Sequence, residues 1–204
     1  MINNYEALDL GRYMKIDKIL HTPAEEIDKQ VQIIAVLADM PEDKVLLLPL
    51  ADYSAMAKQT AFLGTVCDPV KVDGSPVVLG GMRLIPTKDF TKINTAQYVD
   101  FQTFAKDFPG TLPELLSCFL VPEGKAYNDG YDIAEVQKAV RTLNVPTAIG
   151  LVAFFLLSFS TSIAASVTSL EKEASRDRKK AKEWKKKAKE IAGLLQTLGA
   201  GLPI

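Results

Sequence analysis

The 204-residue sequence has few of the side chains on which most enzyme chemistry depends. It contains one histidine, His21, and two cysteines, Cys67 and Cys118, which lie far apart and form no CxxC pair. A Ser-His-Asp or Cys-His arrangement could use only His21 as its base, and this residue is expected beside a helix N-cap, where polar residues are common. The cysteines cannot build a disulfide framework and fit a reduced compartment. We predict no catalytic residues and no enzyme activity.

Recognisable cofactor and metal motifs are also lacking. Gly80-Gly81 has neither the GxGxxG spacing of a dinucleotide site nor a Lys-Ser/Thr partner for phosphate. Asn128, Asp129 and Asp132 are oxygen ligands close together, but a calcium loop needs more carboxylates and a distal bidentate glutamate. A turn followed by a helix N-cap explains these residues more simply. We therefore predict no cofactor and no metal.

Charge is missing from residues 142–170, and lysines follow. This pattern is typical of a membrane span, near 145–167, with positive flanks. Three observations weigh against a span: the continuous apolar core covers only about 149–159, seven Ser or Thr occupy 158–169, and the N-terminus has no apolar signal-peptide region. A buried central helix, apolar on every side, is the favoured interpretation, and the membrane span stays open as an alternative.

Helix signals dominate the rest of the first 160 residues. Thr22-Pro23-Ala24-Glu25 predicts an N-cap, a first-turn proline and a capping-box glutamate. Asp132 is expected to cap another helix. Further helices are predicted from Pro41, over 51–63, over 95–106 and over 112–120.

One segment has the pattern of strands. Two apolar runs flank Gly80-Gly81 and predict a hairpin near 76–86, because glycine accepts the positive φ of a tight turn. The sequence thus predicts a mainly α fold with a small β hairpin, in which a helical body of residues 1–160 precedes a long C-terminal helix.

The remaining residues, 161–204, are predicted to form an amphipathic, basic helical arm. Residues 171–190 carry ten Lys or Arg and five Asp or Glu, a net charge of +5, whereas residues 1–170 carry −6. Apolar residues recur at alternating three- and four-residue steps from 163 to 198, which is the spacing of a coiled-coil seam. Nucleic-acid binding is disfavoured, because acidic residues interleave with the basic ones and Trp184 is the only aromatic residue there.

The seam of the arm needs an apolar cover, which a partner helix, a copy of the same chain or the body could supply. The residues predicted to bind a partner are Trp184, Ala188, Ile191, Leu194, Leu195 and Leu198. Homo-oligomerisation and folding back onto the body both stay open.

Several segments of the body resemble the small tail-assembly proteins of tailed phages and gut-bacterial prophages. They are QVQIIAVL at 30–37, PEDKVLLLPL at 41–50, LGGM at 79–82, TAQYVDFQTF at 95–104, FLVPEGK at 119–125 and YNDGY at 127–131. Together they cover roughly residues 20–160.

The resemblance implies a tail assembly chaperone. Such proteins are encoded beside the long, helical tape measure protein, keep it soluble, help tail-tube subunits polymerise around it and leave before the tail is complete. The family has no catalytic residues to carry over. We therefore expect a non-catalytic assembly factor in the bacterial host cytoplasm that binds the tape measure or other tail proteins. A virion or baseplate subunit and a membrane-anchored protein are the alternatives.

Overall fold

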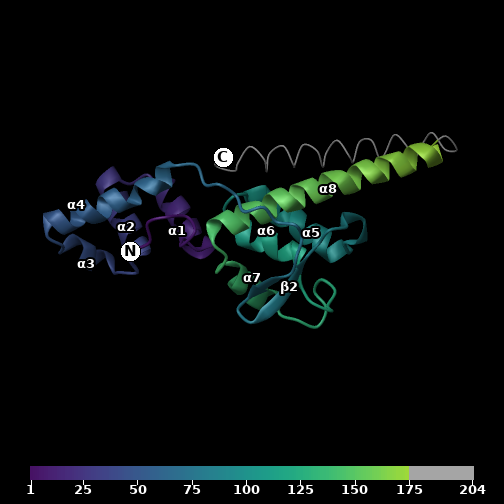
Figure 1. The fold of residues 1–204 in the computed structure, drawn as a ribbon, viewed down its shortest axis with the longest axis horizontal. Coiled ribbons are helices and arrows are strands. Elements are labelled where there is room, and N and C mark those ends of the chain that lie inside the picture. The colour runs from purple at the N-terminus through teal and green to yellow at the C-terminus, as the bar shows by residue number, and fades with distance from the viewer. Residues whose placement is uncertain (175–204) are drawn as a thin grey trace.

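The computed structural model describes residues 1–174 and shows a mainly helical protein with one small sheet (Figure 1). The predicted fold class is confirmed. The described α-helices are α1 (Leu10–Leu20), α2 (Glu26–Ala38), α3 (Glu42–Leu46), α4 (Leu50–Gln59), α5 (Thr95–Phe104), α6 (Leu112–Phe119), α7 (Ile133–Val140) and α8 (Val145–Ala174). The strands are β1 (Val77–Leu79), β2 (Met82–Pro86) and β3 (Leu120–Pro122), and the 3-10 turns are η1 (Thr60–Gly64), η2 (Phe90–Lys92) and η3 (Ala105–Asp107).

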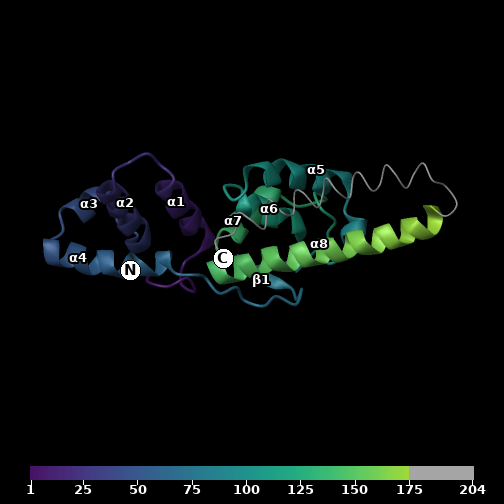
Figure 2. The ribbon, with the colours of Figure 1, turned by 90° about the horizontal axis from the view of Figure 1, so that it is seen from above.

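The elements form two groups along the long axis of the molecule. Helices α1 to α4 make an N-terminal lobe, and α5 to α7 pack with the sheet against α8 (Figures 1 and 2). Helix α8 begins beside the N-terminal lobe and runs away from it in both views. The far end of α8 and helices α3 and α4 are therefore at opposite ends of the described structure.

Helix α1 was not predicted, and its presence corrects the predicted start of α2. Asp9 caps α1 by accepting a hydrogen bond from the Arg12 backbone N–H at 2.8 Å. At the other end of α1, the hydroxyl of Thr22 donates to the Ile19 carbonyl at 2.7 Å. Thr22 therefore serves the last turn of α1, and α2 begins at Glu26 with Glu25 as its N-cap. The prediction that Thr22 caps a helix beginning at Pro23 is wrong.

The predicted hairpin is present and carries a third strand. Strands β1 and β2 pair antiparallel, with Leu79 opposite Met82, and Gly80 and Gly81 make the turn with φ of 55° and 79°. Strand β3 pairs with the other edge of β2, antiparallel, with Ile85 opposite Val121. The helix predicted over 112–120 therefore ends one residue early, at Phe119, because Leu120 belongs to this ladder.

Three apolar clusters hold the fold together. The largest lies between α5, α6, α7, α8 and the sheet and includes a group of phenylalanines whose rings pack at tilted or edge-to-face angles: Phe90, Phe101, Phe119, Phe155 and Phe159. A second cluster joins Leu8, Ile16 and Leu37 to Val145, so it connects the N-terminal lobe with the first turn of α8. A third, in the N-terminal lobe, packs Val45 of α3 on α2.

Backbone hydrogen bonds reinforce the junction between the lobe and α8. Asp9 and Asn144 form an isolated antiparallel bridge. The Leu10 N–H donates to the Leu143 carbonyl at 2.7 Å, and the Val145 N–H donates to the Leu8 carbonyl at 3.0 Å. The chain just before α1 is thus paired with the chain just before α8.

The segment between η1 and β1, residues 65–76, crosses α8 as a strap. The Val70 N–H donates to the Pro146 carbonyl at 3.0 Å. At Gly150 the two backbones are so close that an added Cβ would lie 2.0 Å from the Val70 carbonyl oxygen. Glycine at this position therefore permits the strap to lie directly on the helix.

Helix α8 corrects the expectation of a helix buried on every side. Leu151, Val152, Phe155 and Phe159 are buried, but Leu157 is 69% exposed. One face therefore belongs to the core and the other faces outward. The helix also runs without a break across the predicted boundary between residues 160 and 161, and it continues to Ala174.

Candidate interaction surface

The six residues predicted to bind a partner, Trp184, Ala188, Ile191, Leu194, Leu195 and Leu198, lie outside the described residues. The part of the predicted arm that is described, residues 161–174, is the last portion of α8.

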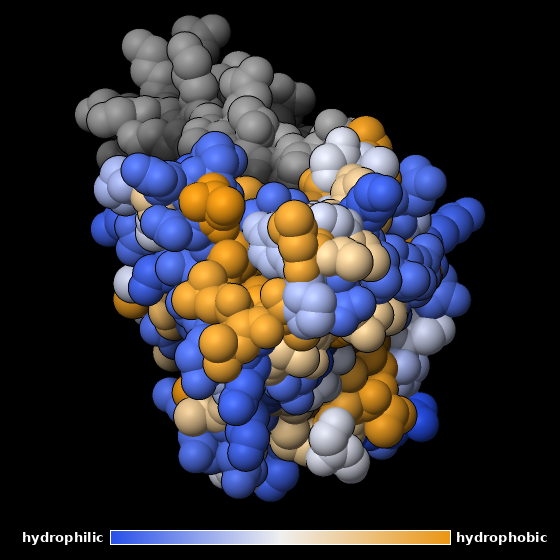
Figure 3. Space-filling view, turned by 90° about the vertical axis from the view of Figure 1, so that its left-hand side faces the viewer, coloured by the Kyte–Doolittle hydropathy of each residue, from blue (hydrophilic) through white to orange (hydrophobic). Residues whose placement is uncertain are grey.

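An apolar surface that was not predicted lies at the opposite end of the protein. Leu46, Leu47 and Leu50 are 70%, 76% and 79% exposed at the junction of α3 and α4. We call these three residues the leucine patch. Figure 3 views this end of the molecule and shows hydrophobic surface surrounded by hydrophilic residues. Scattered exposed leucines are ordinary, but a cluster is typical of an interaction site.

The local sequence forces these leucines outward. Pro41 and Pro49 have extended backbone conformations and bound a helix of only five residues, α3. So short a helix can direct only one side chain in three or four toward α2. Val45 takes the inward place, with 1% exposure, and Leu48 packs partly against the same cluster. Leu46 and Leu47 then face solvent, and Leu50, the first residue of α4, is exposed as well.

Acidic residues lie before and after the leucine patch in the sequence, with one exposed lysine, Lys44, among them. Glu42 and Asp43 in the first turn of α3 and Asp52 in the first turn of α4 are exposed, and they also complement the helix dipoles. Residues 22–64 carry seven Asp or Glu and three Lys, a net charge of −4. A partner for this surface would therefore combine apolar side chains with positive charge.

A cleft of about 820 Å³ opens between α1 and the loop before α8, and some of its charged groups pair with one another. Arg12 lies 2.5 Å from Asp9 and 3.7 Å from Asp39. The Nδ1 atom of His21 is 2.8 Å from the Asp17 carbonyl oxygen. The lining holds one hydroxyl, that of Thr142, which donates to the Ala139 carbonyl at 2.7 Å. Among the described residues that line this cleft, none is a nucleophile oriented by His21.

A buried polar network lies beneath α5. The Gln97 side-chain amide donates to the Cys118 carbonyl at 2.6 Å, and the Tyr127 hydroxyl donates to Asp100 at 2.8 Å. The Tyr127 oxygen is also 3.8 Å from Cys118 Sγ. Burial raises the pKa of the Cys118 thiol to about 12 and raises the pKa of Tyr127. Both groups stay protonated at neutral pH, so the site offers no thiolate. The hydrogen bonds of the network join α5, α6 and the following loop.

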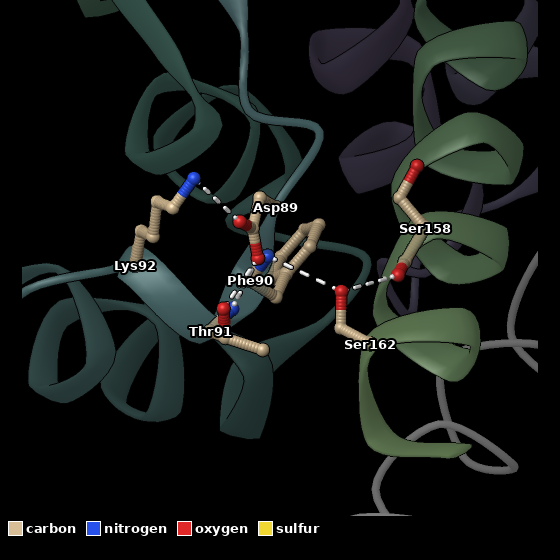
Figure 4. A network of polar contacts seen from close by, with 6 residues as sticks. All are labelled: Asp89, Phe90, Thr91, Lys92, Ser158 and Ser162. Carbon is tan, nitrogen blue, oxygen red and sulfur yellow. Dashed lines mark hydrogen bonds and ion pairs between the residues drawn. The ribbon is translucent and has the colours of Figure 1, made fainter. Parts of the chain in front are cut away.

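The far part of α8 is held to η2 by a polar contact. The Ser162 hydroxyl donates to the Ser158 carbonyl at 2.9 Å and accepts the Phe90 N–H at 3.3 Å (Figure 4). Asp89 caps η2 by accepting from the Thr91 N–H at 3.0 Å and pairs with Lys92 at 3.0 Å. The contact places Phe90 in the aromatic group of the core, 5.2 Å from Phe159.

One stretch of α8, Val145–Ser162, is long and apolar enough to cross a membrane, and half of it is buried within the protein. The strap, the aromatic group and η2 provide this cover. The remaining outward face has no charged side chain from Ala153 to Thr161.

The oxygen-bearing residues of the loop before α7 have structural roles. Asn128 has a left-handed φ of 59°, and Asp132 caps α7 by accepting from the Ala134 N–H at 2.8 Å. The predicted cap is thus confirmed. Within residues 1–174, no three His, Cys, Asp or Glu side chains are grouped so that they could hold a metal ion.

Comparison of the chain with protein-family models, with curated proteins and with solved structures found no match.

Proposed function

We propose that this protein is a non-catalytic phage tail assembly factor, a chaperone that covers apolar helical segments of the tape measure protein. The observation that carries the proposal is the leucine patch, three adjacent leucines that are at least 70% exposed on a folded lobe. The patch lies within residues 41–50, one of the segments that resemble tail assembly proteins. The predicted partner-binding residues at 184–198 would offer a second apolar surface of the same kind.

The size of the leucine patch suits reversible binding. Burying an exposed leucine contributes roughly 1.5 to 3 kcal/mol, so three leucines that are about three-quarters exposed contribute roughly 3 to 7 kcal/mol gross. Association costs at least about 4 kcal/mol in lost translational and rotational freedom. The patch alone therefore gives weak binding. Together with the arm, an interface that buries roughly 400 Å² of apolar surface gains about 10 kcal/mol gross, which leaves a complex that can be released.

The gene neighbourhood provides the first test. We expect a very long, helical reading frame immediately downstream, and a non-viral operon would count against the proposal. Co-expression with that downstream protein is expected to increase its soluble yield and to recover both proteins in one complex.

Variants of the full chain test which surface binds. Leu46→Ser/Leu47→Ser/Leu50→Ser is expected to weaken recovery of the complex without unfolding the lobe, because all three side chains are already exposed. Trp184→Ser/Ile191→Ser/Leu195→Ser tests the predicted arm in the same way. Val66→Ser is the control, since Val66 is an exposed apolar residue that belongs to neither α3 nor α4. Equal recovery with all three variants would refute binding through these surfaces.

Mass spectrometry of purified virions separates a chaperone from a structural subunit. A chaperone leaves before the tail is complete and is expected to be absent from particles. Stoichiometric amounts in particles would instead identify a virion or baseplate subunit.

Helix α8 favours a second candidate, a membrane-anchored protein, because Val145–Ser162 meets the length and composition of a span. In that case the strap and η2 would have to leave the helix, and the protein would resist carbonate extraction. If the protein is the assembly factor, it is expected to be released by carbonate.

A further inference from the structure

We propose that the leucine patch of one molecule binds the basic C-terminal segment, residues 176–198, of a second copy of this chain. The association would be head to tail, since two different surfaces meet. It goes beyond the proposed function and does not depend on any tail protein.

Charge and composition make the two surfaces complementary. The leucine patch is flanked in the sequence by the exposed residues Glu42, Asp43 and Asp52, in a region of net charge −4. The C-terminal segment combines apolar residues at helical spacing with the excess of lysine and arginine that gives residues 171–190 a net charge of +5. Apolar side chains with a positive border are what an acidic, leucine-rich surface requires of a partner.

The geometry excludes a contact between Trp184 and the leucine patch of the same molecule. Helix α8 has 30 residues and is about 45 Å long at 1.5 Å per residue. Its first turn contacts the N-terminal lobe, and its last residue, Ala174, lies at the opposite end (Figures 1 and 2). Trp184 is ten residues further on, so even a fully extended chain carries it at most about 36 Å from Ala174. Trp184 therefore cannot reach its own leucine patch.

The predicted helical form of the segment leads to the same conclusion. As a helix, the 24 residues that follow Ala174 would extend about 36 Å, which is less than the length of α8 alone. The patch that such a segment can reach belongs to another molecule. Each molecule then offers one patch and one segment, so association can continue from copy to copy and forms a ring or an open chain.

Sedimentation velocity on the full-length protein tests the association. Wild type is expected to form species larger than a dimer, whose size increases with concentration and decreases with salt, since salt screens charge pairs at the border. The leucine-patch variant Leu46→Ser/Leu47→Ser/Leu50→Ser and the segment variant Trp184→Ser/Ile191→Ser/Leu195→Ser are each expected to be monomeric over the same range, with dissociation constants raised at least about tenfold. Val66→Ser is expected to behave as wild type.

Mixing the two variants distinguishes a head-to-tail contact from its alternatives. The segment variant keeps a patch and the patch variant keeps a segment, so an equimolar mixture is expected to give a one-to-one dimer that grows no further. A patch variant that still assembles would show that the segments pair with each other and would overturn the proposal. A mixture that stays monomeric would also overturn the proposal. A monomeric wild type would overturn it as well, and would be the result if the segment covered α8 of its own chain instead.

Charge reversal gives a readout that misfolding would not mimic. Glu42→Lys/Asp43→Lys is expected to abolish assembly, and adding Lys185→Glu/Lys186→Glu/Lys187→Glu in the same chain is expected to restore it. Failure of this rescue would contradict the proposed pairing.

A monomeric wild type that still forms a complex with the tape measure protein would overturn self-association while supporting the proposed function, so the two proposals fail separately.

Discussion

Replacing Gly150 by alanine tests the contact between the strap and α8. Two effects oppose each other at this position. Alanine favours the helical conformation by about 1 kcal/mol relative to glycine. However, its Cβ would lie 2.0 Å from the Val70 carbonyl oxygen and 3.2 Å from Val72 Cγ2. The first of these atoms belongs to the backbone, so a change of side-chain rotamer cannot relieve the overlap.

The steric effect is expected to prevail. Overpacking a buried contact costs about 1 to 3 kcal/mol, and displacing the strap would also lose the hydrogen bond from Val70 to Pro146, which contributes about 0.5 to 1.5 kcal/mol. After the gain in helix propensity is subtracted, we expect the free energy of unfolding to fall by roughly 0.5 to 3.5 kcal/mol.

Urea denaturation followed by circular dichroism measures the change. Gly64→Ala is the control, because a Cβ added at Gly64 would have no heavy atom within 4 Å and Gly64 has no positive φ. Hydrogen exchange at the Val70 amide gives a local readout and is expected to become faster in Gly150→Ala alone. A variant that is more stable than wild type would refute the reasoning, since it would show that the strap does not lie on α8.

Three further predictions concern the core. Phe119→Ala removes a ring that packs at a tilted angle against Phe90, Phe101 and Phe155, and it is expected to lower the free energy of unfolding by about 3 to 5 kcal/mol in urea titrations; a loss below about 1 kcal/mol would contradict the described packing. Burial raises the pKa of Tyr13 from 10.0 to about 12, so its contribution to stability is fully present below pH 10 and is lost as the pH rises toward 12; Tyr13→Phe is expected to flatten the fall in thermal stability over that window, and an unchanged slope would argue against burial of the hydroxyl. Because burial raises the pKa of Cys118 to about 12, labelling of this thiol at pH 8 is expected to require unfolding, and mass spectrometry that finds rapid labelling of native protein would refute this.

Local signals in the sequence were sufficient where short-range chemistry decides the structure. Gly80-Gly81 makes its turn because only glycine accepts two consecutive positive φ angles easily, and this holds whatever packs around the hairpin. Asp132 caps α7 through a hydrogen bond to Ala134, two residues away. Both features depend on neighbours in the chain.

Features that depend on distant contacts were missed or misplaced. Strand β3 has only three residues and ends in Pro122, and it is a strand because β2 offers it an open edge. Proline is acceptable there as an edge residue, so the same proline that indicated a helix end belongs to a sheet. Thr22 carries the signature of an N-cap, but its hydroxyl is engaged by the preceding helix, α1.

The candidate surface shows the same division between local and distant effects. The run of four leucines at 46–50, interrupted by Pro49, is visible in the sequence. Which of them face solvent depends on where Val45 meets α2, and that is a tertiary contact. A helix too short to bury a continuous apolar run was the signal that could have identified the leucine patch. The predicted binding residues at 184–198 lie outside the described residues, and their role stays a prediction.

The pairing of Asp9 with Asn144 has a consequence for synthesis on the ribosome. These partners are 135 positions apart, and Leu8 shares its cluster with Val145. An emerging chain therefore cannot complete the packing around Leu8 until Val145 has been translated. Contacts of such long sequence separation slow folding and leave apolar surface uncovered meanwhile. A nascent copy of this protein is thus expected to need protection of the same kind that the finished molecule is proposed to give.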